Sequence, residues 1–137
     1  MNRKNAEQGF TILEMVIVVV ILGVLSAIAV PIYLNSIRQG SIATLKSDIN
    51  ATAIDVGIHQ NGELTNDAPI SAATFNAFRS QSAGNVLTLK TYTRPGDGDT
   101  EYCVEGVHTF SATDKVTFHY NLTKRAIVSG VCVASLL

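Results

Sequence analysis

The stretch Gly9-Phe10-Thr11-Ile12-Leu13-Glu14 opens the segment that decides the fold. After Glu14 no charged side chain appears until Arg38, which leaves 23 uncharged residues from Met15 to Ile37. A helix rises by about 1.5 Å per residue, so this segment reaches roughly 34 Å and is long enough to cross a bilayer core of about 30 Å. The segment therefore predicts a membrane-spanning helix.

Glu14 is the one acidic residue at the edge of this apolar segment. Fourteen of the 23 residues are Val, Ile or Leu. Each contributes about −0.3 to −0.6 kcal/mol to insertion, and their sum outweighs the cost of about 3 kcal/mol for one carboxylate at the bilayer centre. Glu14 therefore does not prevent insertion. Because a carboxylate in such a place is costly without a partner, it indicates a function.

Two general classes of protein fit the hydropathy alone. A secretory signal peptide would use Ala27-Ile28-Ala29 as its small-x-small cleavage site, but ten residues separate Lys4 from the apolar core and Pro31 would follow the cut almost at once. A permanently anchored single-span protein fits equally well, with Arg3 and Lys4 holding that end in the cytoplasm. Neither class explains why a Gly-Phe junction stands just before Glu14.

The N-terminus resembles that of a type IV prepilin of the type IVa class. A short basic leader ends in Gly9, Phe10 would become the new N-terminus, and Glu14 would be the fifth mature residue. Gly23 and Pro31 stand where many pilins of this class have a helix-loosening Gly and a Pro. The resemblance covers about the first 40 residues specifically, and the remainder only in layout. It implies cleavage between Gly9 and Phe10 by a prepilin peptidase and N-methylation of Phe10.

The resemblance also implies roles in assembly. Glu14 of one subunit would pair with the Phe10 amine of its neighbour and set the axial register in a desolvated filament core. The simpler alternative is that Glu14 lies in the headgroup region. Pro31 lacks one helical hydrogen bond and Gly23 lowers helix propensity, so the segment between them is expected to kink or melt. A gently bent helix without such a function is the alternative.

The helical pattern continues past Pro31 and becomes amphipathic. We expect one long helix from Thr11 to His59, ended by the turn-forming dipeptide Asn61-Gly62. Its apolar stripe comprises Ile37, Ile42, Leu45, Ile49, Ala53 and Val56, with Lys46, Asp48, Asn50 and Asp55 between them.

The remainder of the chain predicts a sheet. A short helix from Ser71 to Phe78, capped by Ser71, is expected first, with Phe75 and Phe78 attaching it to the domain. Period-two patterns then predict four strands in an antiparallel meander: Val86–Tyr92, Glu101–Val107, Lys115–Tyr120 and Ala126–Val133. The predicted class is α+β, the pilin fold, with one long N-terminal helix packed on a four-stranded antiparallel sheet. The domains would be a cleaved leader (1–9), an apolar helix (10–37) and a globular head (38–137).

The two cysteines, Cys103 and Cys132, fall in predicted strands. An even count in an exported domain indicates one disulfide, with two unpaired buried thiols as the alternative. Many pilins have a C-terminal cysteine pair that encloses a variable surface loop, which implies such a loop at residues 104–131.

Other candidate sites carry weaker signals, and we predict no metal and no cofactor. The loop carboxylates could bind calcium, although the loop also fits an ordinary hairpin. The histidines lack ligand spacing, and zinc would require reduced thiols beside one of them. Two Asn-x-Thr sequences fit a glycosylation acceptor. The loop carboxylates are Asp97, Asp99 and Glu101, the histidines are His59, His108 and His119, and the glycosylation candidates are Asn50 and Asn121.

The composition excludes several classes of function. The net charge is −1, and the basic residues are too scattered for a phosphate track, so no specific nucleic acid is predicted. No nucleophile elbow or phosphate-binding loop is present, so we predict that the chain is not an enzyme. A binding module for surface adhesion or DNA uptake is the second class.

The predicted function is a structural subunit that polymerises into a type IV pilus, with a minor pilin or a pseudopilin of a type II secretion or competence DNA-uptake system as the alternative. Its partners would be copies of itself, the prepilin peptidase, the inner-membrane pilus assembly machinery and the membrane before assembly. The precursor would cross the bacterial inner membrane once with a cytoplasmic N-terminus, and the assembled protein would be extracellular. Adhesion and twitching motility are not separated by any motif.

Overall fold

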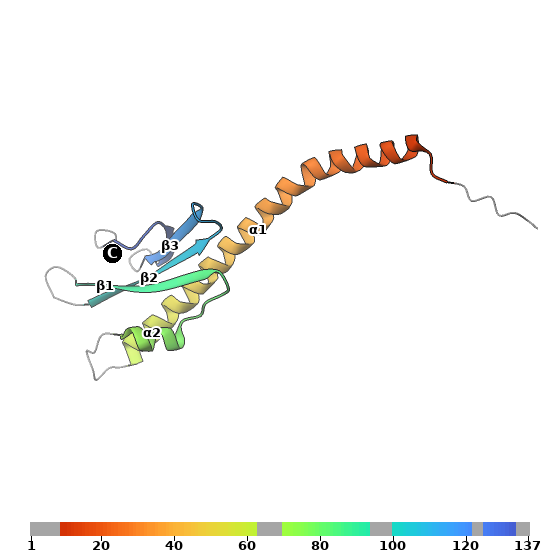
Figure 1. The fold of residues 1–137 in the computed structure, drawn as a ribbon. Helices are drawn as coiled ribbons and strands as arrows, with labels where there is room; N and C mark the ends of the chain where they lie inside the picture. The colour runs from red at the N-terminus through yellow and green to blue at the C-terminus, as the bar shows by residue number, and fades with distance from the viewer. Residues whose placement is uncertain (1–8, 63–69, 94–99, 122–124, 134–137) are drawn as a thin grey trace, which may run out of the picture. The chain divides into compact units, whose positions relative to one another are not determined.

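The computed structural model describes residues 9–62, 70–93, 100–121 and 125–133 (Figure 1). The four strands form one antiparallel sheet in the order β1-β2-β3-β4. The predicted α+β fold, with a long N-terminal helix and a four-stranded sheet, is thereby confirmed. The elements are α1 (Ile12–Gly62), α2 (Ala72–Phe78), β1 (Asn85–Thr93), β2 (Thr100–Thr109), β3 (Lys115–Asn121) and β4 (Ala126–Ser129).

The chain divides into two units, with the boundary between Ile37 and Arg38. The first unit contains the apolar part of α1, and its side chains from Gly9 to Ser36 are all exposed. The second unit, which we call the head, contains the rest of α1, α2 and the sheet. α1 itself is continuous across the boundary.

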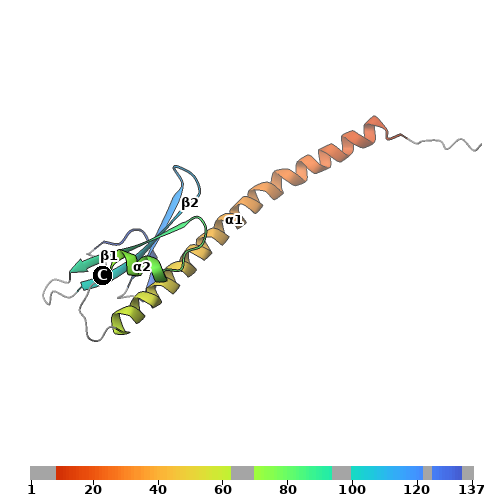
Figure 2. The same ribbon diagram turned by 60° about the horizontal axis from the view of Figure 1, so that its bottom comes forward.

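The core of the head lies between α1 and one face of the sheet. Both views show the strands lying along the yellow part of α1 (Figures 1 and 2). Leu45, Ile49 and Val56 of the predicted stripe supply the helix side of this core, with Phe75 of α2 buried beside them. Ile37, the first residue of the predicted stripe, is exposed. Alternate side chains of β1 and β2 supply the sheet side, because successive residues of a strand face opposite ways. The buried cluster comprises Leu45, Ile49, Val56, Phe75, Leu87, Tyr102 and Val104.

The helix packs tightly against the sheet at Gly106, in the middle of β2. A Cβ atom at this position would lie 2.6 Å from Ile49 Cδ1, 2.7 Å from Ile49 Cγ1 and 2.9 Å from Leu45 Cδ1. Carbon atoms in contact are normally about 3.5 to 4.0 Å apart, so even a methyl group at this position requires Ile49 and Leu45 to shift. Gly106 pairs with Leu87 on one side and Phe118 on the other. The side chains of Leu87 and Phe118 therefore flank a position at which the helix contacts the strand backbone without a side chain between them.

The centre of β2 is buried on both faces, which the prediction of one buried face did not anticipate. Residues 102–106 are all buried. The second cover is residues 130–133, which we call the strap. The prediction that the last strand continues to Val133 is wrong, because β4 ends at Ser129 and Gly130 adopts a φ of 109°. That left-handed conformation suits glycine and turns the chain out of the strand.

The expectation of a surface loop at residues 104–131 is also wrong. This span contains the rest of β2, all of β3 and all of β4. The disulfide therefore encloses most of the sheet, rather than a loop outside it.

Asp48 departs from the predicted polar face of α1, because it is buried. Its carboxylate accepts hydrogen bonds from Ser82 N (2.7 Å), Ser82 Oγ (2.9 Å) and Asn85 Nδ2 (2.7 Å). These bonds fasten the connection between α2 and β1 onto α1. Helical periodicity assigns a residue to a face, but it does not reveal which loop covers that face.

The short helix α2 forms as predicted, with Ser71 as its N-cap and Ser71 Oγ accepting from Thr74 N at 3.1 Å. Figure 2 shows α2 beside the end of α1. The ring of Phe78 stacks on His59 of α1 at 4.3 Å between centroids, and Phe75 is buried. The expectation that Phe75 and Phe78 attach this segment to the domain is confirmed.

We expect Gly106→Ala to lower the free energy of unfolding by about 1 to 3 kcal/mol, since its methyl group would overlap the buried Ile49. Urea unfolding of the full chain in detergent measures this. Gly40→Ala is the matched control, because nothing lies within 4 Å of its Cβ position and alanine favours a helix by up to about 1 kcal/mol. Equal stability of the two variants would contradict the close contact.

Candidate processing and assembly site

The N-terminal site is built around the start of α1. Thr11 caps the helix, since Thr11 Oγ1 accepts from Glu14 N (3.2 Å) and Thr11 O accepts from Met15 N (3.2 Å). Threonine at the cap with glutamate three residues later is the sequence pattern of a capping box. Gly9 and Phe10 precede the helix and are exposed, so the peptide bond between them lies outside regular structure.

Glu14 lies in the first turn of α1 and is exposed. The first turn carries the positive end of the helix dipole, which favours a carboxylate there. Cleavage after Gly9 would place an α-amino group four residues before this carboxylate. The site then combines one anion and one cation at the head of an apolar helix.

The apolar part of α1 leaves its hydrophobic surface without cover inside the chain. The helix is long and apolar enough to cross a membrane, and its most apolar stretch is not buried inside the chain. The core helix of a soluble protein would be buried. Such a surface needs lipid or other protein around it.

Gly23 and Pro31 both lie inside this unbroken part of α1. Nothing stands within 4 Å of the Cβ position of Gly23. No side chain of the described residues therefore requires glycine here for space. The kink or melting expected at these two residues stays a prediction.

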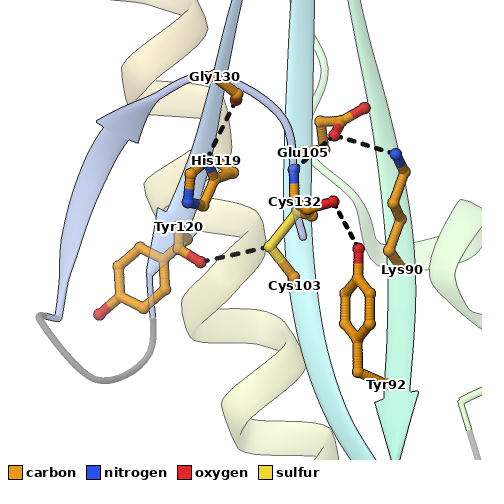
Figure 3. Close-up of polar contacts among 8 residues, drawn as sticks. All are labelled: Lys90, Tyr92, Cys103, Glu105, His119, Tyr120, Gly130 and Cys132. Atoms are coloured by element: carbon orange, nitrogen blue, oxygen red, sulfur yellow. Dashed lines mark hydrogen bonds and ion pairs between the residues drawn. A yellow bond between two sulfur atoms is a disulfide. The ribbon is translucent and has the colours of Figure 1, made fainter. Parts of the chain in front are cut away.

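Cys103 and Cys132 form a disulfide, with their Cα atoms 6.2 Å apart. Figure 3 shows it on the face of the sheet turned away from α1, where Cys132 of the strap meets Cys103 of β2. Both residues are buried. The Cys103 sulfur also lies 3.7 Å from the carbonyl oxygen of Tyr120; a disulfide sulfur carries no proton, so this is a polar contact without hydrogen bonding.

Glu105 is a buried carboxylate on the same face, with 8% of its surface exposed. Its Oε2 accepts from Lys90 Nζ at 3.1 Å and from the backbone N–H of Cys132 at 2.8 Å. The ion pair with Lys90 balances the charge, and a buried carboxylate with two donors is not costly in the way that an unpaired one is.

His119 lies opposite Glu105 in the register of β2 and β3. Its Nδ1 lies 3.1 Å from the carbonyl oxygen of Gly130, so Nδ1 carries the proton and donates. Its Nε2 is buried and has no hydrogen-bond partner within the described ranges. The histidine is therefore a support for the strap, and zinc binding with Cys103 and Cys132 is ruled out by their disulfide.

An ion pair closes the other end of the head, where α1 enters it. Arg38 makes two hydrogen bonds to Asp114 in the turn between β2 and β3, one of them 2.9 Å between Nη2 and Oδ1. Its guanidinium also lies 4.6 Å from the ring centroid of Phe110. The hydrogen bonds from Arg38 lower the pKa of the Asp114 carboxyl, and they raise the pKa of Arg38.

The weaker candidate residues are not brought together as a metal site within the part of the chain that the structure describes. Asp97 and Asp99 lie outside the described residues, so calcium at Asp97, Asp99 and Glu101 is untested. Across residues 9–62, 70–93, 100–121 and 125–133, no three His, Cys, Asp or Glu side chains gather as metal ligands. Asn50 is exposed on α1, whereas Asn121 is buried.

A groove of about 350 Å³ lies between α2 and β1. Its lining includes no histidine, cysteine, acidic or basic side chain, so it offers no group for acid–base chemistry. It is lined by Ile70, Ala72, Phe75, Asn76, Leu87, Thr88, Leu89 and Thr91.

Sequence reasoning missed the Thr11 cap, the Arg38 ion pair and the Glu105 contacts. The first had a local signal, since Thr11 and Glu14 are three residues apart. The others had none, because Arg38 and Asp114 are 76 residues apart and Glu105 and Cys132 are 27 apart.

Comparison with known proteins agrees with this site. A family model described as the prokaryotic N-terminal methylation motif matches residues 4–30. A type IV major fimbrial protein of Dichelobacter nodosus is 28% identical over 93% of this chain and 79% of its own length, and another from the same organism is 33% identical over 69% of this chain and 61% of its own length.

A type II secretion system core protein G of Pseudomonas aeruginosa is 34% identical over 42% of this chain and 41% of its own length. No solved structure matches the chain.

A methylation-type N-terminus on a long helix that packs on an antiparallel sheet defines the class of pilin-like proteins. Within that class, the methylation motif and the similarity to type IV fimbrial proteins support a type IV pilin.

We expect Asp114→Asn to lower stability at neutral pH and to remove part of its dependence on acid. Because the pKa of Asp114 is lowered in the folded state, its contribution is present above the unfolded value of about 3.9 and is lost as the pH falls through the folded value. Urea midpoints at several pH values from 7 to 2 measure this. The deficit of Asp114→Asn should shrink toward low pH, while Asp55→Asn serves as the control; a deficit that is constant with pH would contradict the ion pair.

Proposed function

We propose that this chain is the structural subunit of a type IV pilus filament. The observation that carries the proposal is the apolar half of α1, which is exposed within the chain and follows the Gly9-Phe10 junction. Before assembly, the bilayer would cover this surface. In the filament, the same helix of neighbouring copies would cover it through close apolar contacts.

Processing would convert the membrane form into the assembling form. Prepilin peptidase would cut between Gly9 and Phe10, and the new amine of Phe10 would be N-methylated. The exposed, non-helical position of both residues supports this cut. Arg3 and Lys4 support a cytoplasmic N-terminus for the precursor, because basic residues are retained on that side.

Glu14 would set the register between subunits by pairing with the Phe10 amine of a neighbour. Its place in the first turn supports this role, since carboxylate and amine would meet at the same end of neighbouring helices. The pair would be strongest once lipid and water are excluded from the filament core.

The N-terminus of the mature protein tests the proposal. Protein sheared from the cell surface would be analysed by N-terminal sequencing and intact mass. We expect the chain to begin at N-methylated Phe10 and to be abundant in the sheared fraction. A mature protein that begins at Val30, or one that retains Met1 and stays in the membrane, would overturn the proposal.

Substitution of Glu14 tests the register role separately. Glu14→Val should still insert into the membrane, because it removes the one charge of the span, but we expect its filament yield to fall at least tenfold, equivalent to about 1.4 kcal/mol. Sheared filaments and membrane-bound subunit would be quantified together. Met15→Val is the matched control, and normal filament yield from Glu14→Val would refute the role.

The similarity to a secretion protein favours a second candidate, a pseudopilin or minor pilin. A deletion strain separates the two functions. Loss of surface filaments with intact secretion supports the pilus subunit, whereas loss of secretion with intact filaments supports the pseudopilin.

A further inference from the structure

The strap crosses the outer face of the sheet from β3 toward β1. Figure 3 shows Gly130 beside His119 of β3, and Cys132 between Glu105 of β2 and Tyr92 of β1. The strap therefore contacts three strands within three residues. Beyond Gly130 its position does not follow from strand pairing, because β4 ends at Ser129.

The backbone of Cys132 is held on both sides. Its N–H donates to Glu105 Oε2 at 2.8 Å, and its carbonyl oxygen accepts from the Tyr92 hydroxyl at 2.6 Å. Together these bonds fix the peptide groups on either side of the Cys132 side chain, and thereby the direction in which its sulfur points.

Gly130 is held in the same way two residues earlier. Its N–H donates to the carbonyl oxygen of Thr117 at 2.9 Å, and its own carbonyl oxygen accepts from His119 Nδ1 at 3.1 Å. The four bonds to Gly130 and Cys132 form what we call the clamp. None of them involves a sulfur atom.

We propose that the clamp docks the strap without the disulfide, so that it places the two thiols for oxidation and afterwards shields the bond from reductants. The donors and acceptors of the clamp all belong to the sheet and to the strap backbone, so the docked geometry does not require the covalent link. The charge of Glu105 is already balanced by Lys90 at 3.1 Å, so the clamp needs no further counter-ion.

The chemistry in each direction is ordinary thiol–disulfide exchange. On oxidation by a small disulfide such as glutathione disulfide, both Sγ–H bonds break, one Sγ–Sγ bond forms, and two electrons and two protons pass to the oxidant, which becomes two thiols. On reduction by dithiothreitol, its thiolate attacks one Sγ, which breaks the Sγ–Sγ bond, releases the other cysteine as a thiolate and forms a mixed disulfide. The second thiolate of dithiothreitol then attacks the dithiothreitol sulfur of that mixed disulfide and releases the second cysteine, so that the reductant leaves as a cyclic disulfide and its two protons pass to the two cysteines.

Access of the reductant depends on opening of the strap. Cys103 is 1% exposed and Cys132 is 4% exposed, and the attacking thiolate must reach a sulfur directly. Reduction should therefore be slow in the closed state, with a rate set by the fraction of time that the clamp is open.

The first experiment removes the disulfide and keeps the clamp. Amide hydrogen exchange of the full-length C103A/C132A chain in detergent would be followed at residues 130 and 132. We expect both amides to exchange at least tenfold more slowly than in an unstructured peptide. Exchange at the unstructured rate in the folded variant would overturn the proposal.

The second experiment keeps the disulfide and weakens the clamp. Tyr92→Phe removes one neutral hydrogen bond and should raise the rate of reduction by dithiothreitol roughly 3- to 10-fold. Glu105→Gln should have an effect at least as large, because it also releases Lys90. The matched controls are Tyr120→Phe, from the helix-facing side of the sheet, and Asp55→Asn, from α1.

Both controls should reduce within about twofold of the unaltered chain. Tyr92→Phe preserves the ring and keeps the test valid even if Glu105→Gln does not fold. A rate for Tyr92→Phe equal to that of Tyr120→Phe would show that the clamp does not guard the bond, and would overturn the proposal whether or not the protein forms filaments.

Discussion

The packing of α1 against the backbone of β2 at Gly106 is the constraint on which the rest of the head depends. A shift of the strand by one residue would bring Glu105 or Val107 beneath Ile49, where even a methyl group overlaps the Ile49 and Leu45 side chains. With the register fixed in this way, Cys103, Glu105 and their neighbours on β1 and β3 must face outward. The packing of α1 on one face of the sheet therefore determines which residues on the other face contact the strap.

Patterns within one element allowed most of the fold to be predicted. The uncharged run and the apolar stripe located α1, and period-two alternation located the strands to within two residues, apart from the end of β4. Asp48 and the residues after Ser129 were assigned wrongly for a shared reason. Their surroundings come from distant segments, the connection before β1 in one case and the outer face of β2 in the other, and no local period reports on such cover.

The candidate site also contains residues that can be predicted from local sequence and residues whose partners are distant in the chain. The residues from Gly9 to Glu14 are contiguous, so their chemistry can be read directly from the sequence. The partners of Arg38 and Glu105 depend on how the turn after β2 and the strap fold back, which requires the register of the whole sheet. The cysteines were an intermediate case, because their number indicated a bond while the structure showed that it spans most of the sheet.

The ion pair of Arg38 with Asp114 determines how mechanical load would enter the head. Arg38 is the first residue of the head along α1, and its partner sits in the turn that joins β2 and β3, the two central strands of the sheet. A pull along the helix axis would therefore reach these two strands through the ion pair as well as through the helix backbone. Since β2 is cross-linked to the far end of the chain through Cys103, tension delivered at Arg38 ends on a covalent bond rather than on a free edge.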